Sequence, residues 1–130
     1  MSLKILMVDD EPDAEILFRQ NFRREIRKGV YDFFFAQSGG DALTLLEGME
    51  LPDVLALLSD INMPGMSGVE LLGEVKERWP ELPVMMITAY ADPGTAACVK
   101  QKGAQDLVTK PVDFDFLKQQ LEQMSAGARG

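Results

Sequence analysis

The fold of this chain is decided by residues 57–68, whose sequence is LLSDINMPGMSG. Asp60 closes the largely apolar run 53–58, which predicts a strand buried on both faces, and a loop rich in Pro, Gly and Ser follows directly. A carboxylate in this position lies at the carboxyl end of a central strand, where open α/β sheets place their ligand sites. Asp60 is therefore the first candidate functional residue.

The segments on either side alternate between strands and helices. Apolar runs predict strands at 4–8, 31–36, 53–60, 83–90 and 106–109. Helical spacing of apolar residues, with Ser, Asp or Pro near the start, predicts helices at 12–29, 38–49, 67–79, 92–103 and 113–124. Five strands alternating with five helices predict an α/β fold: a doubly wound, flavodoxin-like parallel sheet of order 2-1-3-4-5 with helices on both faces.

The size and charge of the chain fit one globular domain, since it has 130 residues and a net charge of -8. We expect that domain to span residues 1–124 and residues 125–130 to form a tail or a truncated linker. Neither a signal peptide nor an apolar run long enough to cross a bilayer is recognisable in these residues. A cytoplasmic location without membrane contact is therefore expected.

Histidine is absent and Cys98 is the only cysteine. An internal disulfide, the usual zinc sites and Ser-His or Cys-His catalytic pairs are thereby excluded, and Cys98 is expected to be a small buried residue. Basic residues cluster once, at Arg19, Arg23, Arg24, Arg27 and Lys28. Because cations near the carboxyl end of a helix offset its dipole, these residues are interpreted as a solvated face. The negative net charge argues against direct nucleic-acid binding.

Two more aspartates, Asp9 and Asp10, follow the first predicted strand. In strand order 2-1-3-4-5 the first and third strands are neighbours, so Asp9, Asp10 and Asp60 converge. Three carboxylates at close range repel unless a cation is bound, and donors that are all oxygen atoms indicate Mg²⁺, or Mn²⁺. The alternative is that the acidic residues only cap the helix beginning near Pro12, for which Asp10 or Glu11 would suffice.

A carboxylate beside such a cation can act as a nucleophile toward phosphorus. Phosphoryl transfer then requires in-line positioning and neutralisation of charge on the phosphoryl oxygens. Thr88, at the end of the fourth strand, offers a hydroxyl, and Lys110, at the end of the fifth, offers an ammonium. Taken singly, Thr88 can be an ordinary strand residue and Lys110 a surface lysine. Their shared position at one edge of the sheet favours a joint role.

Four segments together resemble the signatures of bacterial response-regulator receiver domains of the chemotaxis type. They are 8–11 (VDDE), 59–68 (SDINMPGMSG), 88–90 (TAY) and 110–111 (KP), in the family's order and over nearly the whole chain. The resemblance implies a phosphorylation-dependent switch of a two-component system, in which a histidine kinase or phosphotransfer protein supplies a phosphoryl group. It also implies that the chain is not an enzyme with a separate substrate and catalyses only its own phosphorylation and hydrolysis.

The resemblance also implies roles for individual residues around Asp60. Asp60 would become the aspartyl-phosphate, and Asp10 and Asp60 would ligate Mg²⁺ together with the main-chain carbonyl of Asn62. Asp9 would assist through a water molecule. Thr88 would move toward the phosphate, and Lys110 would pair with it. The peptide bond that follows Lys110 would be cis, as is usual in the family.

Positions that tune such a switch are implied in the same way. The family's switch aromatic corresponds to Leu107, which has no ring to rotate between exposed and buried positions. Asn62 and Tyr90 correspond to positions that tune dephosphorylation, and the bulky Tyr90 is expected to slow it by shielding the phosphate. A half-buried loop aromatic is the alternative for Tyr90. The signalling surface, which could also form a homodimer, is expected on the helix at 92–103, the strand at 106–109 and the last helix.

Two alternatives are left open. The first is a vestigial receiver that acts as a phosphorylation-independent interaction module. The complete set of Asp9, Asp10, Asp60, Thr88 and Lys110 argues against it. The second is a phosphatase of the haloacid-dehalogenase type, which carries an aspartate two residues after a nucleophile on its first strand. Here that position is Asn62, and the candidate nucleophile ends the third strand.

Besides the protein that donates the phosphoryl group, the expected partner is an output domain or a downstream protein. The sequence leaves the identity of this partner open.

Overall fold

The central element is a parallel sheet. The computed structural model describes residues 3–49, 54–63, 65–89 and 92–129, and residues 126–129 by their backbone alone. The strands are β1 (Leu3–Val8), β2 (Tyr31–Ala36), β3 (Val54–Asp60), β4 (Val84–Thr88) and β5 (Asp106–Thr109). Neighbouring strands pair in parallel in the order β2-β1-β3-β4-β5, which confirms the predicted order.

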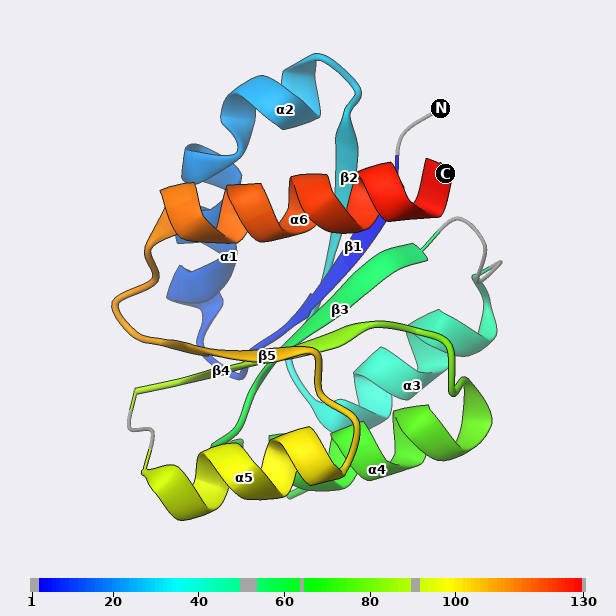
Figure 1. Ribbon diagram of the computed structural model, residues 1–130. Helices are drawn as coiled ribbons and strands as arrows, with labels where there is room; N and C mark the ends of the chain where they lie inside the picture. Colours follow the sequence, from blue (N-terminus) through cyan, green and yellow to red (C-terminus); the bar gives the residue numbers. More distant parts are fainter. Residues whose placement is uncertain (1–2, 50–53, 64, 90–91, 130) are drawn as a thin grey trace.

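Helices cover both faces of this sheet, as Figure 1 shows. They are α1 (Pro12–Asn21), α2 (Arg23–Arg27), α3 (Gly39–Glu47), α4 (Gly68–Arg78), α5 (Pro93–Gln101) and α6 (Phe114–Arg129). Helices α1 and α6 lie on one face, whereas α3, α4 and α5 lie on the other. The doubly wound architecture is thus confirmed, with one more helix among the described residues than the pattern predicts.

The extra helix arises at Phe22, where the predicted continuous helix from residue 12 to 29 is interrupted. Phe22 has φ -105° and ψ 15°, outside the helical region, although its N–H still donates to the carbonyl of Phe18 at 2.9 Å. Its ring is fully buried, with its centroid 4.8 Å from that of Phe33. The helical hydrogen bonds continue through this bend while the ring packs on the sheet, so the spacing of apolar residues does not reveal it.

Each central strand is packed on both sides. On β1, Ile5 and Met7 belong to the core shared with α1 and α6, whereas Leu6 and Val8 belong to the core shared with α3, α4 and α5. Strand β3 is buried from its first residue to Asp60, its last, as its apolar run predicts. A polar side chain at the end of β3 is therefore held by well-packed neighbours on either side.

Side-chain caps begin the helices where the sequence predicts them. The Ser38 hydroxyl accepts a hydrogen bond from the Asp41 N–H at 3.1 Å, at the start of α3. At the start of α4, Ser67 accepts from the Glu70 N–H at 3.2 Å, and Glu70 accepts from the Ser67 N–H at 3.3 Å. This reciprocal capping box fixes where α4 begins and therefore how the loop after Asp60 ends.

The helices near the end of the chain differ in detail from expectation. Cys98 is exposed, so its predicted burial is wrong: the neighbouring Val99 occupies the buried position on α5. Helix α6 continues to Arg129, beyond residue 124, and Ser125 on it is buried. Among the described residues, none of the helices combines the length and the apolar character that a membrane span requires.

Candidate functional site

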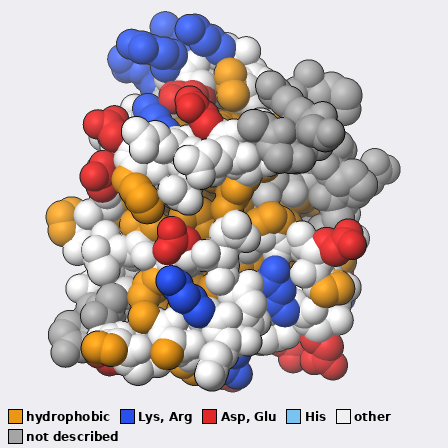
Figure 2. All heavy atoms as spheres, in the orientation of Figure 1, with side chains coloured by type: hydrophobic (Ala, Val, Ile, Leu, Met, Phe, Trp, Pro, Cys, Tyr) orange, Lys and Arg blue, Asp and Glu red, His pale blue; other side chains and the backbone are white. Residues whose placement is uncertain are grey.

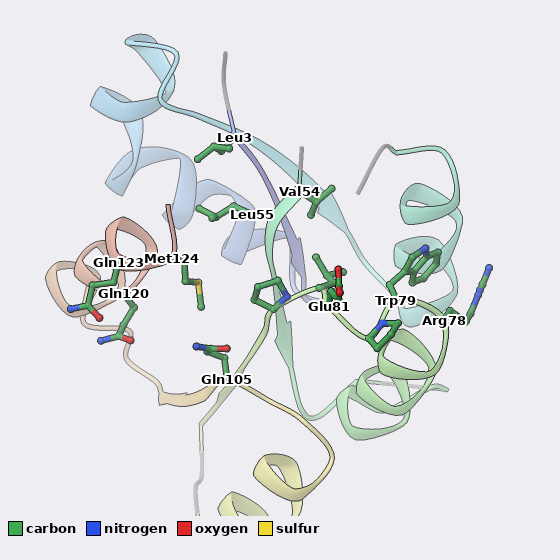
Figure 3. Close-up of a pocket in the computed structure, with 13 residues that line it drawn as sticks. Leu3, Val54, Leu55, Arg78, Trp79, Glu81, Gln105, Gln120, Gln123 and Met124 are labelled. Atoms are coloured by element: carbon green, nitrogen blue, oxygen red, sulfur yellow. The ribbon is translucent and has the colours of Figure 1, made fainter. Parts of the chain in front are cut away.

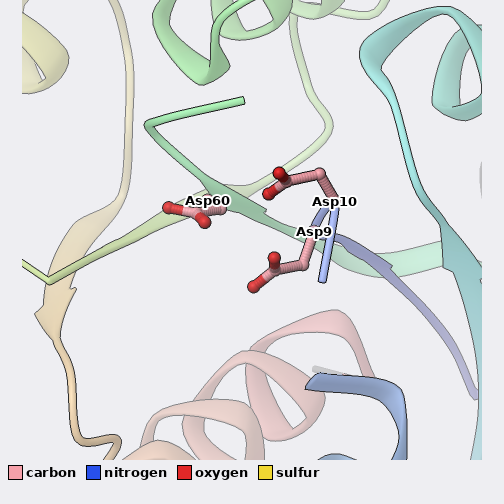
Figure 4. A group of neighbouring side chains, drawn as sticks. All are labelled: Asp9, Asp10 and Asp60. Carbon is pink, nitrogen blue, oxygen red and sulfur yellow. The ribbon is translucent and has the colours of Figure 1, made fainter. Parts of the chain in front are cut away.

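Three carboxylates meet at the carboxyl edge of the sheet. Asp9 directly follows β1 and Asp60 ends β3, and these strands are neighbours, with Val8 paired to Ser59. One carboxylate oxygen from each of Asp9, Asp10 and Asp60 lies within 4.8 Å of the others. Figure 4 shows the three side chains around a common space. Asp9 and Asp60 are buried and Asp10 is half-buried, so the predicted convergence is observed.

Lys110 bridges two of these carboxylates from the end of β5. Its Nζ lies 3.2 Å from Oδ2 of Asp9 and 3.2 Å from Oδ2 of Asp60. The Lys110 N–H donates to the carbonyl of Thr88 at 2.7 Å, which ties the ends of β4 and β5 together. The peptide bond between Lys110 and Pro111 is cis. The ammonium thus reaches across the sheet edge to the carboxylates that end β1 and β3.

Burial and the neighbouring charges shift two pKa values in this cluster. Burial raises the pKa of Asp60, the hydrogen bond from Lys110 lowers it, and the charge of Asp9 raises it further, so the net shift is upward. For Lys110, burial lowers the pKa, but the hydrogen bonds and charges of Asp60 and Asp9 outweigh this and raise it. Lys110 is therefore held as a cation, whereas the charge on Asp60 is unfavourable without further positive charge nearby.

Asp60→Asn is therefore expected to stabilise the metal-free protein at neutral pH, raising its thermal midpoint by roughly 2 to 5 °C. The pKa of Asp60 is raised above its usual 3.8, so below that pH the carboxyl is protonated in both the folded and unfolded states. As pH rises through the folded-state pKa, Asp60 ionises and the wild type loses stability. The Asp60→Asn variant has no ionisable group at this position and does not lose this stability. The advantage of the variant should grow from about pH 4 toward neutral, measured by calorimetry.

The control for this measurement is Asp32→Asn, which neutralises an exposed carboxylate on β2 at the far end of the sheet. It should leave the thermal midpoint nearly unchanged at every pH, because an exposed and unpaired charge contributes little. A loss of stability in Asp60→Asn at neutral pH would contradict the unfavourable charge inferred for Asp60.

The other predicted site residues lie around the same edge. Thr88 is fully buried as the last residue of β4. Asn62 is exposed beyond Asp60, and its N–H lies 3.3 Å from Oδ1 of Asp60. Leu107 on β5 is half-buried and packs against the core on the side of α3, α4 and α5. Tyr90 lies outside the described residues.

The alternative that the acidic residues cap α1 is not observed, because among the described residues no side chain forms a capping hydrogen bond at the start of this helix. Oδ1 of Asp9 accepts a hydrogen bond from the Glu11 N–H at 2.9 Å, whereas the side chain of Glu11, at the N-cap of α1, makes no capping bond. Asp9 therefore orders the turn before α1 with one oxygen and contacts Lys110 with the other. Asp9 and Asp60 both form hydrogen bonds, whereas none is recorded for the Asp10 carboxylate among the described residues.

Gly68 also shapes the site, although the sequence indicates only that it belongs to the loop after Asp60. The Gly68 N–H donates to the Ile61 carbonyl at 2.8 Å, so the start of α4 lies directly against the end of β3. A Cβ at this position would overlap the Asp60 carbonyl oxygen and lie 2.7 Å from Cα of Ile61. Only a glycine permits this approach without displacing the backbone that carries Asp60.

The carboxylates fit a hard divalent cation. The cluster offers only oxygen atoms, two of its three members are buried, and burial together with the like charge of Asp9 raises the pKa of Asp60. A cation would remove this conflict, and a site of few carboxylates is the arrangement in which Mg²⁺ keeps several waters. The residues present therefore fit Mg²⁺, or Mn²⁺.

A sizeable hollow lies elsewhere in the structure. It has a volume of about 900 Å³ and lies at the opposite edge of the sheet, beside the starts of β1 and β3. Leu3, Val54, Trp79 and Met124 are among its lining residues (Figure 3). None of the candidate site residues that the structure describes lines this hollow, so the converging charges, and not this hollow, locate the site.

Comparison with known proteins gives the class of the chain. Residues 5–122 match the response regulator receiver domain, and the chain belongs to this family. Members of the family act in two-component systems, are generally not true enzymes, bind Mg²⁺ through acidic residues, and interact with kinases or phosphotransfer proteins and with output domains. The family predicted from the four segments is thereby confirmed.

Individual relatives cover the chain to different extents. It is 47% identical over 79 residues, 61% of its length, to the DNA-binding transcriptional regulator NtrC of Klebsiella pneumoniae, of which this match spans 16%. It is 40% identical over 113 residues, 85% of its length and 81% of the relative's, to an uncharacterized 14.6 kDa protein of Leptolyngbya boryana. The chain thus matches only a small part of the NtrC relatives.

Solved structures agree with the fold. The signal receiver domain of an HD domain-containing protein from Pseudomonas fluorescens is 24% identical, with a TM-score of 0.87 over 99% of this chain and 98% of that one. The response regulator TrrA of Thermotoga maritima, solved in complex with Mg²⁺ and BeF, is 28% identical. Its TM-score is 0.78 over 94% of this chain and 98% of that chain.

Proposed function

We propose that the chain is a phosphorylation switch in which Asp60 accepts a phosphoryl group from a histidine kinase or phosphotransfer protein. The observation that carries this proposal is the placement of the Asp60 carboxylate, buried at the end of β3 beside Asp9 and Asp10, with the Lys110 ammonium 3.2 Å away. A nucleophile next to a fixed cation is the arrangement that phosphoryl transfer requires, since positioning and charge neutralisation dominate its catalysis.

In the transfer step, a carboxylate oxygen of Asp60 attacks phosphorus while the N–P bond to the donor histidine breaks. The electron pair of that bond stays with the departing imidazole, and Asp60 becomes an acyl phosphate. Lys110, whose Nζ lies 3.2 Å from Oδ2 of Asp60, donates a hydrogen bond to one phosphoryl oxygen. The hydroxyl of Thr88, at the end of β4, donates to another. Water attack on phosphorus later returns the carboxylate and inorganic phosphate.

Asp10 and Asp60 would hold Mg²⁺, or Mn²⁺, together with the main-chain carbonyl of Asn62, and Asp9 would contact it through water. When bound, the ion neutralises charge on the carboxylates and on the phosphoryl oxygens. The spacing of these carboxylates within 4.8 Å supports the assignment, as does the Mg²⁺ and BeF complex of the relative TrrA. Asn62 and Tyr90 would tune the access of the hydrolytic water.

The signal would leave through the face formed by α5, β5 and α6, toward an output domain, a downstream protein or a second copy of the chain. Leu107 lies on β5 in this face and is half-buried against the core. Because Leu107 has no ring, the two states would differ through Thr88 and the neighbouring loops. The receiver unit would span residues 1–124, and residues 125–130, which α6 includes as far as Arg129, would form a tail or a truncated linker.

The experiment that tests the acceptor is intact-mass measurement after incubation with Mg²⁺ and acetyl phosphate, comparing the wild type with Asp60→Asn and Asp32→Asn. The wild type and Asp32→Asn should each gain the mass of one phosphoryl group, whereas Asp60→Asn should gain none. Omitting Mg²⁺ should abolish the gain in the wild type and in Asp32→Asn. If the wild type gains nothing and binds no beryllofluoride either, the chain is a vestigial interaction module instead.

Metal binding is predicted to require Asp10. At a Mg²⁺ concentration about a hundredfold above its dissociation constant, the wild type should be stabilised by about 2.7 kcal/mol. Asp10→Asn should lose most of this gain, because a neutral amide replaces one of the clustered carboxylates. Thermal unfolding with and without Mg²⁺ measures the difference, and Asp32→Asn should behave as the wild type does. An undiminished Mg²⁺ effect in Asp10→Asn would place the ion elsewhere.

A phosphatase of the haloacid-dehalogenase type would need a general acid two residues after Asp60. The residue at the required position is Asn62, whose amide cannot donate a proton as a carboxylic acid does, and its N–H points to Oδ1 of Asp60. We therefore expect no turnover of a phosphomonoester such as p-nitrophenyl phosphate.

A further inference from the structure

The strongest charge feature outside the carboxylate cluster lies on α2 and the turn that follows it. Arg23, Arg24, Arg27 and Lys28 are all exposed there, and we call these four residues the α2 basic patch. Figure 2 shows their region as a group of Lys and Arg side chains over α2. This patch belongs to a chain with 21 acidic and 13 basic residues, so its sign is opposite to that of the molecule as a whole.

None of the four cations forms an ion pair within the part of the chain that the structure describes. The ion pairs near the patch use other residues: Arg19 pairs with Glu15, and Lys118 with Glu25 at 3.1 Å. Within the patch, like charges stand four residues apart twice, at Arg23 with Arg27 and at Arg24 with Lys28. Such pairs destabilise a helix, and the dipole of a five-residue helix offsets only part of this effect.

The patch also borders a hollow of about 360 Å³ between α2 and α6. Arg24 and Lys28 line it, together with Val30, whose exposed fraction is 38%, large for an apolar residue. Two carboxylates line the hollow as well: that of Glu25, which Lys118 neutralises, and that of Glu122. An apolar contact thus lies beside the unpaired cations on the same surface.

This surface lies away from the carboxylate cluster. The chain passes from α2 into β2, whose first residue, Tyr31, pairs with Leu3 at the start of β1. The α2 basic patch therefore lies near the amino-terminal edge of the sheet, whereas Asp60 lies at the carboxyl edge. A partner bound at α2 would leave Asp60 accessible to a phosphoryl donor.

We infer that the α2 basic patch and Val30 form a docking surface for an acidic protein segment that carries an apolar side chain beside its carboxylates. The carboxylates of the partner pair with the unpaired cations, and its apolar side chain contacts Val30 in the hollow. A nucleic acid fits less well, because its phosphates would gain nothing from the apolar side chain of Val30.

The test uses a fluorescently labelled peptide with a central pair of leucines flanked by glutamates, titrated with the whole chain and followed by anisotropy. The wild type should bind it, and more weakly as salt increases. Arg24→Glu combined with Lys28→Glu should weaken binding by roughly tenfold or more. Lys100→Glu combined with Lys102→Glu, two exposed lysines near α5, changes the net charge equally and should alter affinity by less than about twofold.

The apolar contact is tested separately. Val30→Ser should weaken binding of the leucine-containing peptide by roughly threefold. Binding of a peptide with glutamines in place of the leucines should not change. Equal losses in the two double variants would show that only the overall charge matters and would overturn the proposal. So would absence of peptide binding by the wild type, or tighter binding of duplex DNA than of the peptide.

The cost of the like charges can be measured without a ligand. Arg27→Gln removes one member of a like-charged pair and should raise the thermal midpoint by roughly 1 to 2 °C. A comparable fall would show that Arg27 supports the fold, and the proposal that these cations are kept for a partner would then be wrong.

Discussion

Lys110→Met is expected to slow phosphoryl acceptance from acetyl phosphate by roughly a hundredfold to a thousandfold, the usual effect of removing one donor that stabilises developing charge. The physical reason is that Lys110 is the only cation whose ammonium is recorded within 4 Å of Asp60 among the described residues. Without it, the phosphoryl oxygens lose a charge-assisted hydrogen bond. The rate is measured by intact mass at a series of incubation times.

The same substitution should affect Mg²⁺ in the opposite direction. Lys110 now occupies Oδ2 of both Asp9 and Asp60, at 3.2 Å each, so it competes with a metal for the same carboxylates. Its removal leaves more uncompensated negative charge and should tighten Mg²⁺ binding, as measured by calorimetric titration. A general loss of structure would weaken both functions, so the opposite signs identify a local effect.

Lys118→Met provides the matched control. Lys118 is exposed to a similar extent, 31% against 29% for Lys110, and also pairs with a carboxylate, that of Glu25 at 3.1 Å. It lies on α6, away from the cluster, so neither phosphoryl acceptance nor Mg²⁺ binding should change by more than about twofold. If Lys110→Met behaved like Lys118→Met, the role assigned to Lys110 would be wrong.

Gly68→Ala is expected to destabilise the protein by at least about 2 kcal/mol and to impair phosphoryl acceptance as well. The added methyl group would overlap the Asp60 carbonyl oxygen and lie 2.9 Å from the carbonyl carbon of the same residue. Because these are backbone atoms of a buried strand, they cannot turn aside as a flexible side chain could. The end of β3 must shift, and the Asp60 carboxylate shifts with it.

The matched control is Gly73→Ala, the same substitution on the same helix. A Cβ at Gly73 meets nothing within 4 Å, so the change should stabilise the protein by roughly 0.5 to 1 kcal/mol through the better helix propensity of alanine. Urea unfolding measures both variants. Equal free energies of unfolding for Gly68→Ala and the wild type would show that the contact with Asp60 relaxes without cost.

Local features of the sequence predicted most of the fold. The capping box at Ser67 and Glu70, the apolar run that ends at Asp60 and the alternation of strands with helices each involve residues close together in the chain. Such features need no knowledge of long-range packing. The strand order follows from the rules for parallel sheets, and it brings Asp9 and Asp60 to neighbouring strand ends.

Features that depend on contacts between distant segments were not predictable in this way. The bend at Phe22 follows from packing of its ring on Phe33, and the exposure of Cys98 depends on how α5 is rotated against the sheet. Neither spacing nor composition reports the rotation of a helix to within one residue. The predicted burial of Cys98 failed for that reason.

The sequence by itself determined the family, the sheet and the set of charged residues at its carboxyl edge, because residue type and order suffice to place strand ends in a parallel α/β fold. The tertiary structure alone decided that Lys110 bridges Asp9 and Asp60, that Gly68 lies against the backbone of Asp60, and that the cations on α2 remain without ion pairs among the described residues. These are distances between atoms far apart in sequence, and they are set by side-chain packing across elements.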